Sequence, residues 1–265
     1  MGLTYRMAVA TKRFVPGPLR RWLGAQLAGW TVAQWRRDEA RVVQALGTNV
    51  AAGPFAGMRY LEVGSGSSLG PKLAGTYELE ICDALEAAIA GKPTLILNAG
   101  CDEGYYAVGL LIRLPRARCI AWDRSELARD RGRQLASING VADRLELRAE
   151  ATATAIQECL GDAERVLIIC DIEGGEVEVL DPTAAPQLRR CTIIAELHEH
   201  LRPGLTSVLA ERFKPSHHVE LIKSRSRGRE DIPDEVREHL HDWRSAIDER
   251  RITEQQWMVA NMREL

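Results

Sequence analysis

Polar residues follow two apolar runs of the chain and have the types that proton transfer requires. The run 166–170 is followed by Asp171 and Glu173, and the run 192–196 is followed by His198. An imidazole with a pKa of about 6.5 suits removal of a proton from a reacting hydroxyl group. We therefore predict three catalytic residues, with His198 as the general base and Asp171 orienting the acceptor or a cofactor amine. Glu173 is the next candidate for the base.

Other roles remain open for these residues. Asp171 could instead cap the helix that follows it, and His198 could be an ordinary polar residue at a strand end. Asp171, Glu196 and His198 could also hold a divalent metal ion at adjacent strand ends. Because the sequence shows no close ligand spacing, we predict no metal.

The segment 94–111 predicts a ligand-binding turn between a strand and a helix. A short apolar run meets Asn98, and Gly100 and Gly104 then lead into a helical pattern. Gly100 allows a tight turn, and the missing side chain at Gly104 lets strand and helix pack closely. The free N–H groups at the start of the helix would then face the ligand.

An acidic residue follows this turn at a meaningful distance. About 20 residues later the run 118–122 ends at Asp123, the spacing at which a doubly wound sheet places an acid against ribose hydroxyls. The G-x-x-x-G turn is not the G-x-G-x-x-G of pyrophosphate binders, so a dinucleotide is disfavoured. S-adenosylmethionine, which has a ribose but no phosphate, fits better. The alternative is that Asp123 only caps the next helix, although Ser125 already offers a capping side chain.

The elements that must position these residues alternate along the chain. Alternation of strands with helices predicts an α/β fold with a parallel sheet covered on both faces. Seven apolar runs predict strands, at 95–98, 118–122, 145–148, 166–170, 192–196, 218–222 and 256–260. Helices are expected at 103–113, 125–138, 151–160, 174–188 and 202–212. The basic run SRSRGR, between the last two strands, is typical of a solvated loop.

A second glycine-rich turn, GSGS at 64–67, precedes these elements. Pro71 and Gly75 interrupt the helix that should follow it, and no strand with an acidic end lies at the expected distance. A strand before this turn would also be one too many. We predict that 64–67 does not bind the cofactor and that 57–80 forms a lead-in or lid, with Tyr77 and Glu78 approaching the site.

Several motifs together resemble the FkbM-type family of class I S-adenosylmethionine-dependent methyltransferases, many of which act on hydroxyl oxygens of sugars and natural products. The motifs are PKLAGTYELE, NAGCDEGYYA, ASINGVADRLEL, CDIEGGEVEVL and IIAELHE, within residues 70–223. The D-x-E-G-x-E segment is the most specific of them. The resemblance implies a Rossmann-like seven-stranded class I methyltransferase sheet that binds S-adenosylmethionine.

The resemblance also implies which residues contact the cofactor. The set comprises Asn98, Gly100, Glu103 and Gly104 at the methionine end, Asp123 at the ribose, and Glu150 with Ala151 near the adenine. Besides these, we predict that Asp171 and Arg124 also bind the cofactor. Two positions depart from the pattern of the class. Asn98 stands where an acidic residue is common, and Asp123-Arg124 replaces a frequent Glu-Pro.

The first part of the chain has a different character. Residues 1–50 carry eight Lys and Arg but only Asp38 and Glu39 as acids, and apolar residues recur there at helical spacing. We predict an N-terminal helical extension at 1–56 and a methyltransferase domain at 57–265. The extension could cover the domain, join subunits of a homo-oligomer, or present a basic surface to a membrane or an anionic partner.

Composition is that of a globular protein with an ample core. Of its 265 residues 45% are hydrophobic and 27% are charged. Six cysteines without metal-ligand spacing indicate reduced thiols and a cytoplasmic protein. No apolar run approaches the roughly 20 residues that span a bilayer, and the N-terminus lacks the features of a signal peptide.

The expected function is therefore O-methylation of a hydroxyl group on a small molecule, such as a sugar or natural product, by an S-adenosylmethionine-dependent enzyme. Nucleic acid is not the expected partner. Two alternatives remain: a methyltransferase that uses the basic N-terminal segment to act on RNA or a glycan, and a catalytically silent cofactor-binding protein.

Overall fold

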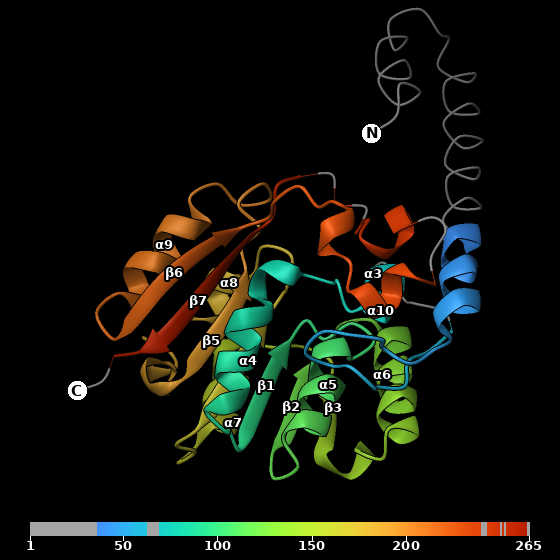
Figure 1. The fold of residues 1–265 in the computed structure, drawn as a ribbon. Coiled ribbons are helices and arrows are strands. Elements are labelled where there is room, and N and C mark those ends of the chain that lie inside the picture. Colours follow the sequence, from blue (N-terminus) through green and yellow to red (C-terminus); the bar gives the residue numbers. More distant parts are fainter. Residues whose placement is uncertain (1–35, 63–68, 240–242, 250, 252, 264–265) are drawn as a thin grey trace, which may run out of the picture.

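The computed structural model describes residues 36–62, 69–239, 243–249, 251 and 253–263. Its centre is a seven-stranded sheet in the order β3-β2-β1-β4-β5-β7-β6 (Figure 1). Strands β1 to β5 run parallel, and β7 is antiparallel to both of its neighbours. The strands are β1 Leu95–Ala99, β2 Arg118–Trp122, β3 Leu145–Arg148, β4 Val166–Cys170, β5 Thr192–Glu196, β6 His217–Lys223 and β7 Gln256–Met262. All seven predicted strands are thus confirmed, with ends that differ by at most two residues.

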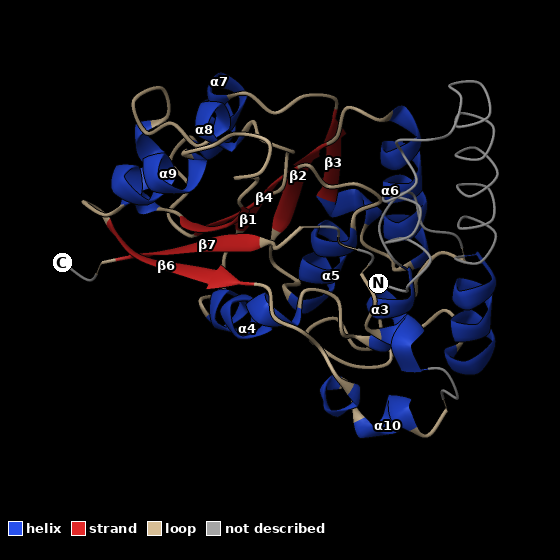
Figure 2. Ribbon diagram, turned by 90° about the horizontal axis from the view of Figure 1, so that it is seen from above, coloured by secondary structure: helices blue, strands red, loops and turns tan. Residues whose placement is uncertain are grey.

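Helices cover both faces of the sheet (Figure 2). One face carries α3 Leu69–Ala74, α4 Cys82–Ala90, α5 Tyr105–Arg113 and α6 Glu126–Ile138. The other carries α7 Ala153–Leu160, α8 Glu176–Val179 and α9 Leu205–Phe213. This is the predicted Rossmann-like α/β layout. Its switch point lies between β1 and β4, where the chain begins to build the sheet in the opposite direction and where open α/β sheets bind ligands.

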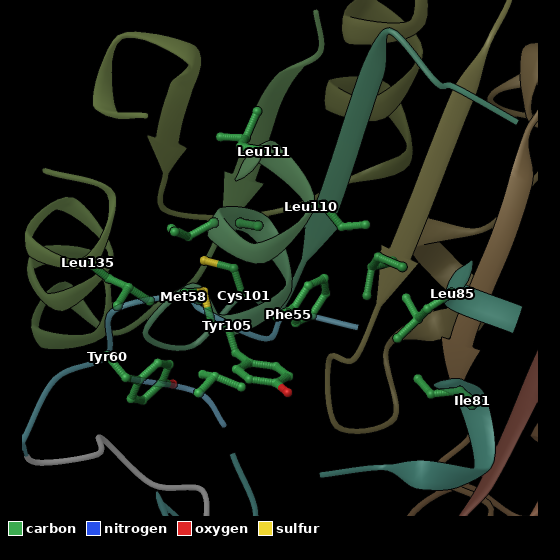
Figure 3. Close-up of a cluster of buried hydrophobic side chains, with 14 of the residues drawn as sticks. Phe55, Met58, Tyr60, Ile81, Leu85, Cys101, Tyr105, Leu110, Leu111 and Leu135 are labelled. Carbon is green, nitrogen blue, oxygen red and sulfur yellow. The ribbon is translucent and has the colours of Figure 1, made fainter. Parts of the chain in front are cut away.

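Two apolar cores fill the spaces between the sheet and its helices. In β1, Ile96 belongs to the core under α4 and α5, whereas Leu95 and Leu97 belong to the core under α7 and α9. This division follows from the alternation of side chains along a strand. Figure 3 shows the first core, in which Phe55 packs edge-on against Tyr105 with ring centroids 5.1 Å apart.

One predicted helix is wrong. The segment 174–188 was expected to be continuous, but it contains the four-residue helix α8 and a separate 3-10 turn, Pro186–Arg190. Pro182 and Pro186 lack the backbone N–H that a continuing helix needs. The other predicted helices are present and begin one to three residues later than expected.

The lead-in segment forms more helix than its sequence suggests. Helix α3 includes Pro71, because a proline in the first turn forfeits an N–H that has no helical partner there. Gly75, with a φ of 76°, follows the end of the helix. Arg59 forms only an isolated bridge with Asn49 and does not join the sheet. The GSGS turn at 64–67, and the prediction about it, lie outside the described residues.

The segment before α3 and the connection between β6 and β7 also pack against the domain. Residues 36–46 are helical, and Val42, Val50 and Phe55 belong to the core beside α5. Between β6 and β7 the chain forms the 3-10 turn Arg229–Asp231, helix α10 Asp234–Arg237 and the 3-10 turn Trp243–Ala246. The predicted amphipathic helix before residue 36 lies outside the described residues. No described helix combines the length and apolar character that a membrane crossing demands.

The first prediction concerns His217, which is buried between β6 and the end of α9. Its Nε2–H donates to the carbonyl of Cys191 at 2.8 Å, and its Nδ1 accepts from Ser216 at 2.8 Å. Burial lowers the pKa of His217, although the carbonyls of Cys191 and Phe213 oppose this shift. Unfolded chains therefore bind the proton more readily. The contribution to stability is present above a pH of about 6.5 and is lost as the pH falls through the folded pKa.

Urea unfolding at pH 7 and pH 5 tests this expectation. Wild-type protein should lose more unfolding free energy between the two values than His217→Gln loses, because the glutamine does not titrate. Equal losses in both proteins would show that His217 does not contribute to acid sensitivity.

Candidate functional site

The loops that follow β1 and β4 touch at the switch point. Gly100 has a φ of 73°, and a Cβ atom on it would lie 1.6 Å from the carbonyl oxygen of Asp171. The N–H of Asp171 in turn donates to the carbonyl of Ala99 at 2.9 Å. Only glycine permits this approach, so Gly100 brings the two strand ends together.

A cavity of about 720 Å³ opens on one side of this contact. We call it the β2–β4 cavity. The predicted cofactor residues that line it are Gly100, Asp123, Arg124, Glu150, Ala151 and Asp171. Cavities of this size accommodate small organic ligands and cofactors.

Asp123 occupies the tip of β2 at the wall of this cavity. Its carboxylate accepts N–H groups from Asp102 at 2.9 Å and from Ser125 at 2.8 Å. The cap of α6 is Ser125, whose hydroxyl accepts from Ala128. Asp123 therefore holds the two neighbouring loops while each carboxylate oxygen keeps capacity for a further hydrogen bond. Nearby, Arg124 forms an exposed ion pair with Glu150 at 2.6 Å.

Three residues predicted at the methionine end do not line either cavity at the switch point. Asn98 is fully buried in β1, and its side-chain amide has no hydrogen-bond partner among the described residues. Glu103 is also fully buried, where it accepts from the Tyr60 hydroxyl at 2.5 Å and from Lys72 at 2.9 Å. It points into the protein because these two residues approach from the lead-in segment.

Gly104 also lies away from both cavities, and its role is in the backbone before α5. It precedes α5 with a φ of 90°, and a Cβ atom there would be 3.6 Å from the Cα atom of Gly132 in α6. The sequence analysis attributed the need for glycine to close packing of strand and helix. The structure shows ordinary contact distances instead, and the left-handed backbone is what favours glycine.

A second cavity, of about 540 Å³, lies across the switch point and is called the β4–β5 cavity. It shares Gly100, Asp123, Asp171 and Glu173 with the first cavity. The remaining wall includes aromatic and ionisable side chains, among them Tyr77, Tyr105, Tyr106, Glu196, His198, His200, Glu249 and Arg251. The lead-in segment thus reaches this cavity through Tyr77, as its sequence predicts.

The three predicted catalytic residues meet in this cavity. The Nε2 atom of His198 lies 3.5 Å from Asp171 and 3.3 Å from Glu173. On the other side of the ring, Nδ1 lies 2.7 Å from the carboxylate of Glu176. Asp171 does not cap α8 as an alternative interpretation suggested, because Gly175 occupies the N-cap.

Glu176 is a further member of this cluster, and the sequence did not predict its place there. It is fully buried, and its Oε1 also accepts the N–H of Gly174 at 3.1 Å. The signal was present in the D-x-E-G-x-E motif, whose last acid is Glu176. The motif alone does not show that this acid, in the first turn of α8, contacts His198.

The acidic surroundings change the protonation of the cluster. Burial opposes a charge on His198, but the hydrogen bond to Glu176 and the charges of Asp171, Glu176 and Glu196 outweigh it and raise the pKa of His198 to about 9. Withdrawal from water and the carboxylates of Glu196 and Glu78 raise the pKa of Asp171 well above its ordinary value. The sequence suggests an imidazole with an ordinary pKa. In the structure, the raised pKa of His198 favours its protonated form.

Arg251 closes the far wall of the β4–β5 cavity. It pairs with Glu196 and Glu249, each at 2.6 Å, and with Glu78. Burial and Glu78 raise the pKa of Glu196 to about 7, although Arg251 and His198 oppose the rise. This network links the lead-in segment, β5 and the connection between β6 and β7, which together form the wall.

The basic run SRSRGR takes part in the same network. The run forms the predicted loop, with Arg225, Ser226 and Arg229 exposed. The exception is Arg227, whose side chain is only 8% exposed and pairs with Glu80 and Glu249. The guanidinium also donates to the carbonyl of Thr76 at 2.9 Å. Arg227 therefore holds the insertion against the lead-in segment, a contact between residues about 150 positions apart in the sequence that local patterns do not reveal.

Comparisons with known proteins add the following. No family model matches the chain, and no curated protein matches it either. Similar solved structures include the O-methyltransferase TomG of Streptomyces achromogenes in complex with S-adenosylmethionine, at 15% identity over 66% of this chain and 77% of that one, with a TM-score of 0.42. The S-adenosylhomocysteine-bound methyltransferase PaMTH1 of Podospora anserina matches at 16% identity over 73% and 79%, with a TM-score of 0.45.

A precorrin-6y C5,15-methyltransferase from Geobacter metallireducens is similar at 16% identity over 69% of this chain and 88% of that one, with a TM-score of 0.44. The fold assignment rests on the strand order and not on these similarities. By that order, the chain has the seven-stranded Rossmann-like sheet of class I methyltransferases.

Proposed function

We propose that this protein is an S-adenosylmethionine-dependent methyltransferase that acts on a hydroxyl oxygen of a small molecule. The observation that carries the proposal is the meeting of two cavities at the switch point, where Gly100, Asp123, Asp171 and Glu173 belong to both. One cavity can hold a nucleoside and the other an acceptor. Group transfer requires such adjacency, because the two reacting atoms must approach within about 3–3.5 Å.

The β2–β4 cavity suits the cofactor in size and in chemistry. The hydroxyl groups of a ribose can donate hydrogen bonds to Asp123. The adenine would lie toward Glu150 and Ala151, with Arg124 at the rim. Gly100 and Asp171 both line this cavity, so the methionine end would lie beside their strand ends, and its amino group is attracted to the carboxylate of Asp171. Asn98, Glu103 and Gly104 would then stabilise the loop between β1 and α5 from within the protein.

The β4–β5 cavity suits a hydroxylated acceptor. The rings of Tyr77, Tyr105 and Tyr106 offer apolar faces, and the carboxylates of Glu173 and Glu196 accept hydrogen bonds from hydroxyl groups. A sugar-like ring combines these two features. The surplus of carboxylates around the cavity repels phosphate groups, which favours a neutral small molecule over RNA.

The cofactor supplies an activated methyl group on its sulfonium. Asp171, Glu173 and His198 face the point where the acceptor hydroxyl would approach that group. When bound, the cofactor would supply the methyl group to the acceptor oxygen, and the electron pair of the broken carbon–sulfur bond would stay on sulfur. The carboxylates of Asp171 and Glu173 would accept the hydroxyl proton. Glu173, which is 75% exposed, can pass the proton to solvent.

The second prediction tests cofactor binding through Asp123. Asp123→Ala should weaken S-adenosylmethionine binding by about 1–3 kcal/mol, because the ribose hydroxyls lose their acceptor. Isothermal titration calorimetry measures this, with Glu220→Ala, an exposed carboxylate on β6, as the control. Unchanged affinity in a folded Asp123→Ala protein would remove the ribose assignment. Failure of the wild type to bind S-adenosylmethionine would overturn the proposed function itself.

A further inference from the structure

The tips of β4 and β5 bring together three side chains that commonly bind metal ions. Asp171, Glu196 and His198 each offer one ligand atom, and these atoms all lie within 4.8 Å of one another. The two strands are parallel neighbours, so their carboxyl ends meet. Two ligands on opposite sides of an ion at about 2.2 Å would stand roughly 4.4 Å apart. Small side-chain rotations are therefore enough to surround an ion.

His198 is oriented as a metal ligand would be. A histidine that binds a metal usually donates its other ring N–H to a carboxylate, which fixes the tautomer and the plane of the ring. Glu176 accepts from Nδ1 of His198 at 2.7 Å and is itself fully buried. This arrangement directs Nε2 toward Asp171 and Glu173, so that its lone pair would point to the side of those carboxylates once its proton is displaced.

The distribution of charge also favours a cation at this point. Arg251 is shared among Glu78, Glu196 and Glu249, and thus its positive charge is already compensated. In the part of the chain that the structure describes, Asp171 and Glu173 are approached by His198 but form no ion pair with a Lys or Arg. A divalent ion would compensate these carboxylates directly.

We propose that Asp171, Glu196 and His198 bind a divalent cation and that Glu176 positions His198 for this purpose. The inference rests on the proposed function and adds a metal to its acceptor cavity. Two carboxylates and one imidazole suit ions such as Mn²⁺, which accept both oxygen and nitrogen ligands. Three protein ligands leave coordination positions open for the acceptor oxygen, and the ion would lower the pKa of that hydroxyl group.

This arrangement assigns a proton path as well. Glu173, which lies beside the cluster and is open to solvent, would accept the hydroxyl proton of the acceptor. His198 then serves as a ligand and not as the proton acceptor. The proton that His198 holds without an ion is displaced when the ion binds, as with other histidine ligands.

The third prediction is that the purified protein, after dialysis against EDTA, binds one Mn²⁺ ion per chain. Electron paramagnetic resonance of free Mn²⁺ reports this without any need for turnover. Glu196→Gln and His198→Ala should abolish the binding, and Glu176→Gln should weaken it by about 10–100-fold because it positions a ligand. His218→Ala and Glu211→Gln, exposed residues on β6 and α9, are the matched controls and should bind as the wild type does.

Absence of Mn²⁺ binding in the wild type would overturn the metal proposal, as would unchanged binding in folded Glu196→Gln and His198→Ala proteins. Circular dichroism establishes the folding of each variant, and Asp171→Asn provides a third variant if one of the others does not fold. Calorimetry with S-adenosylmethionine in EDTA separates the two proposals. Cofactor binding and methyl transfer without any metal would contradict the metal site and leave the proposed function standing.

Discussion

The His198→Ala variant is expected to lower kcat by about 10²–10⁴-fold, the usual effect of losing a group that assists proton removal. The ring points toward Asp171 and Glu173 in the acceptor cavity and does not line the β2–β4 cavity. Affinity for S-adenosylmethionine should therefore change little.

Radiolabelled methyl transfer to an acceptor found in a panel of hydroxylated small molecules measures this effect. His218→Ala is the surface control, and His200→Ala is the more demanding one. His200 lines the same cavity, with its ring centroid 5.8 Å from that of His198. It should matter far less, since no described carboxylate holds it in place. Retention of more than about a third of wild-type kcat by His198→Ala would exclude a catalytic role.

Asp171→Asn should behave differently, because Asp171 lines both cavities. Removing its charge takes away attraction for a cationic cofactor as well as a partner of His198. Both cofactor affinity and kcat are expected to fall. A loss of kcat alone would restrict Asp171 to the acceptor side.

Gly100→Ala should have the largest effect on the integrity of the site. The added Cβ would lie 1.6 Å from the carbonyl oxygen of Asp171 and 2.6 Å from its carbonyl carbon, so the ends of β1 and β4 must separate. Overpacking costs about 1–3 kcal/mol, and the left-handed backbone adds about 1–2 kcal/mol for a residue with a side chain. We expect about 2–5 kcal/mol less unfolding free energy and loss of cofactor binding.

Gly140→Ala provides a matched control for this substitution. Gly140 has a φ of 68°, close to the 73° of Gly100, but a Cβ atom there would have no neighbour within 4 Å. Gly140→Ala should therefore lose only the unfolding free energy that a left-handed backbone costs a residue with a side chain. Urea unfolding of both variants isolates the contact between the two strand ends. If Gly100→Ala were no less stable than Gly140→Ala, the close approach at the switch point would not constrain the fold.

The amino-acid sequence by itself determined the strands and the polar residues at their ends. Strands β1 and β4 are buried on both faces and therefore appear as continuous apolar runs. A polar residue directly after such a run must lie at the carboxyl edge of a parallel sheet. Because of that geometry, the sequence alone predicts that Asp123, Asp171 and His198 lie near one another.

Only the tertiary structure decided which way side chains outside the strands turn. Glu103 follows the glycine turn and resembles a ligand-facing acid, yet Tyr60 and Lys72 draw it into the core. Glu176 resembles an ordinary helix-start acid, yet it faces His198, 22 residues away in the sequence. Local spacing specifies positions within an element, whereas the partner of a buried charge depends on which distant segments pack beside it.

The wall of the β4–β5 cavity is the clearest example of contacts that the sequence does not predict. Arg251 contacts Glu78, which lies 173 residues earlier in the sequence, and Arg227 of the SRSRGR run is buried against the same lead-in segment. Arg227 can be buried because the carboxylates of Glu80 and Glu249 compensate its charge. The sequence therefore predicted the sheet and the polar strand ends, while long-range ion pairs decided the shape of the cavity around them.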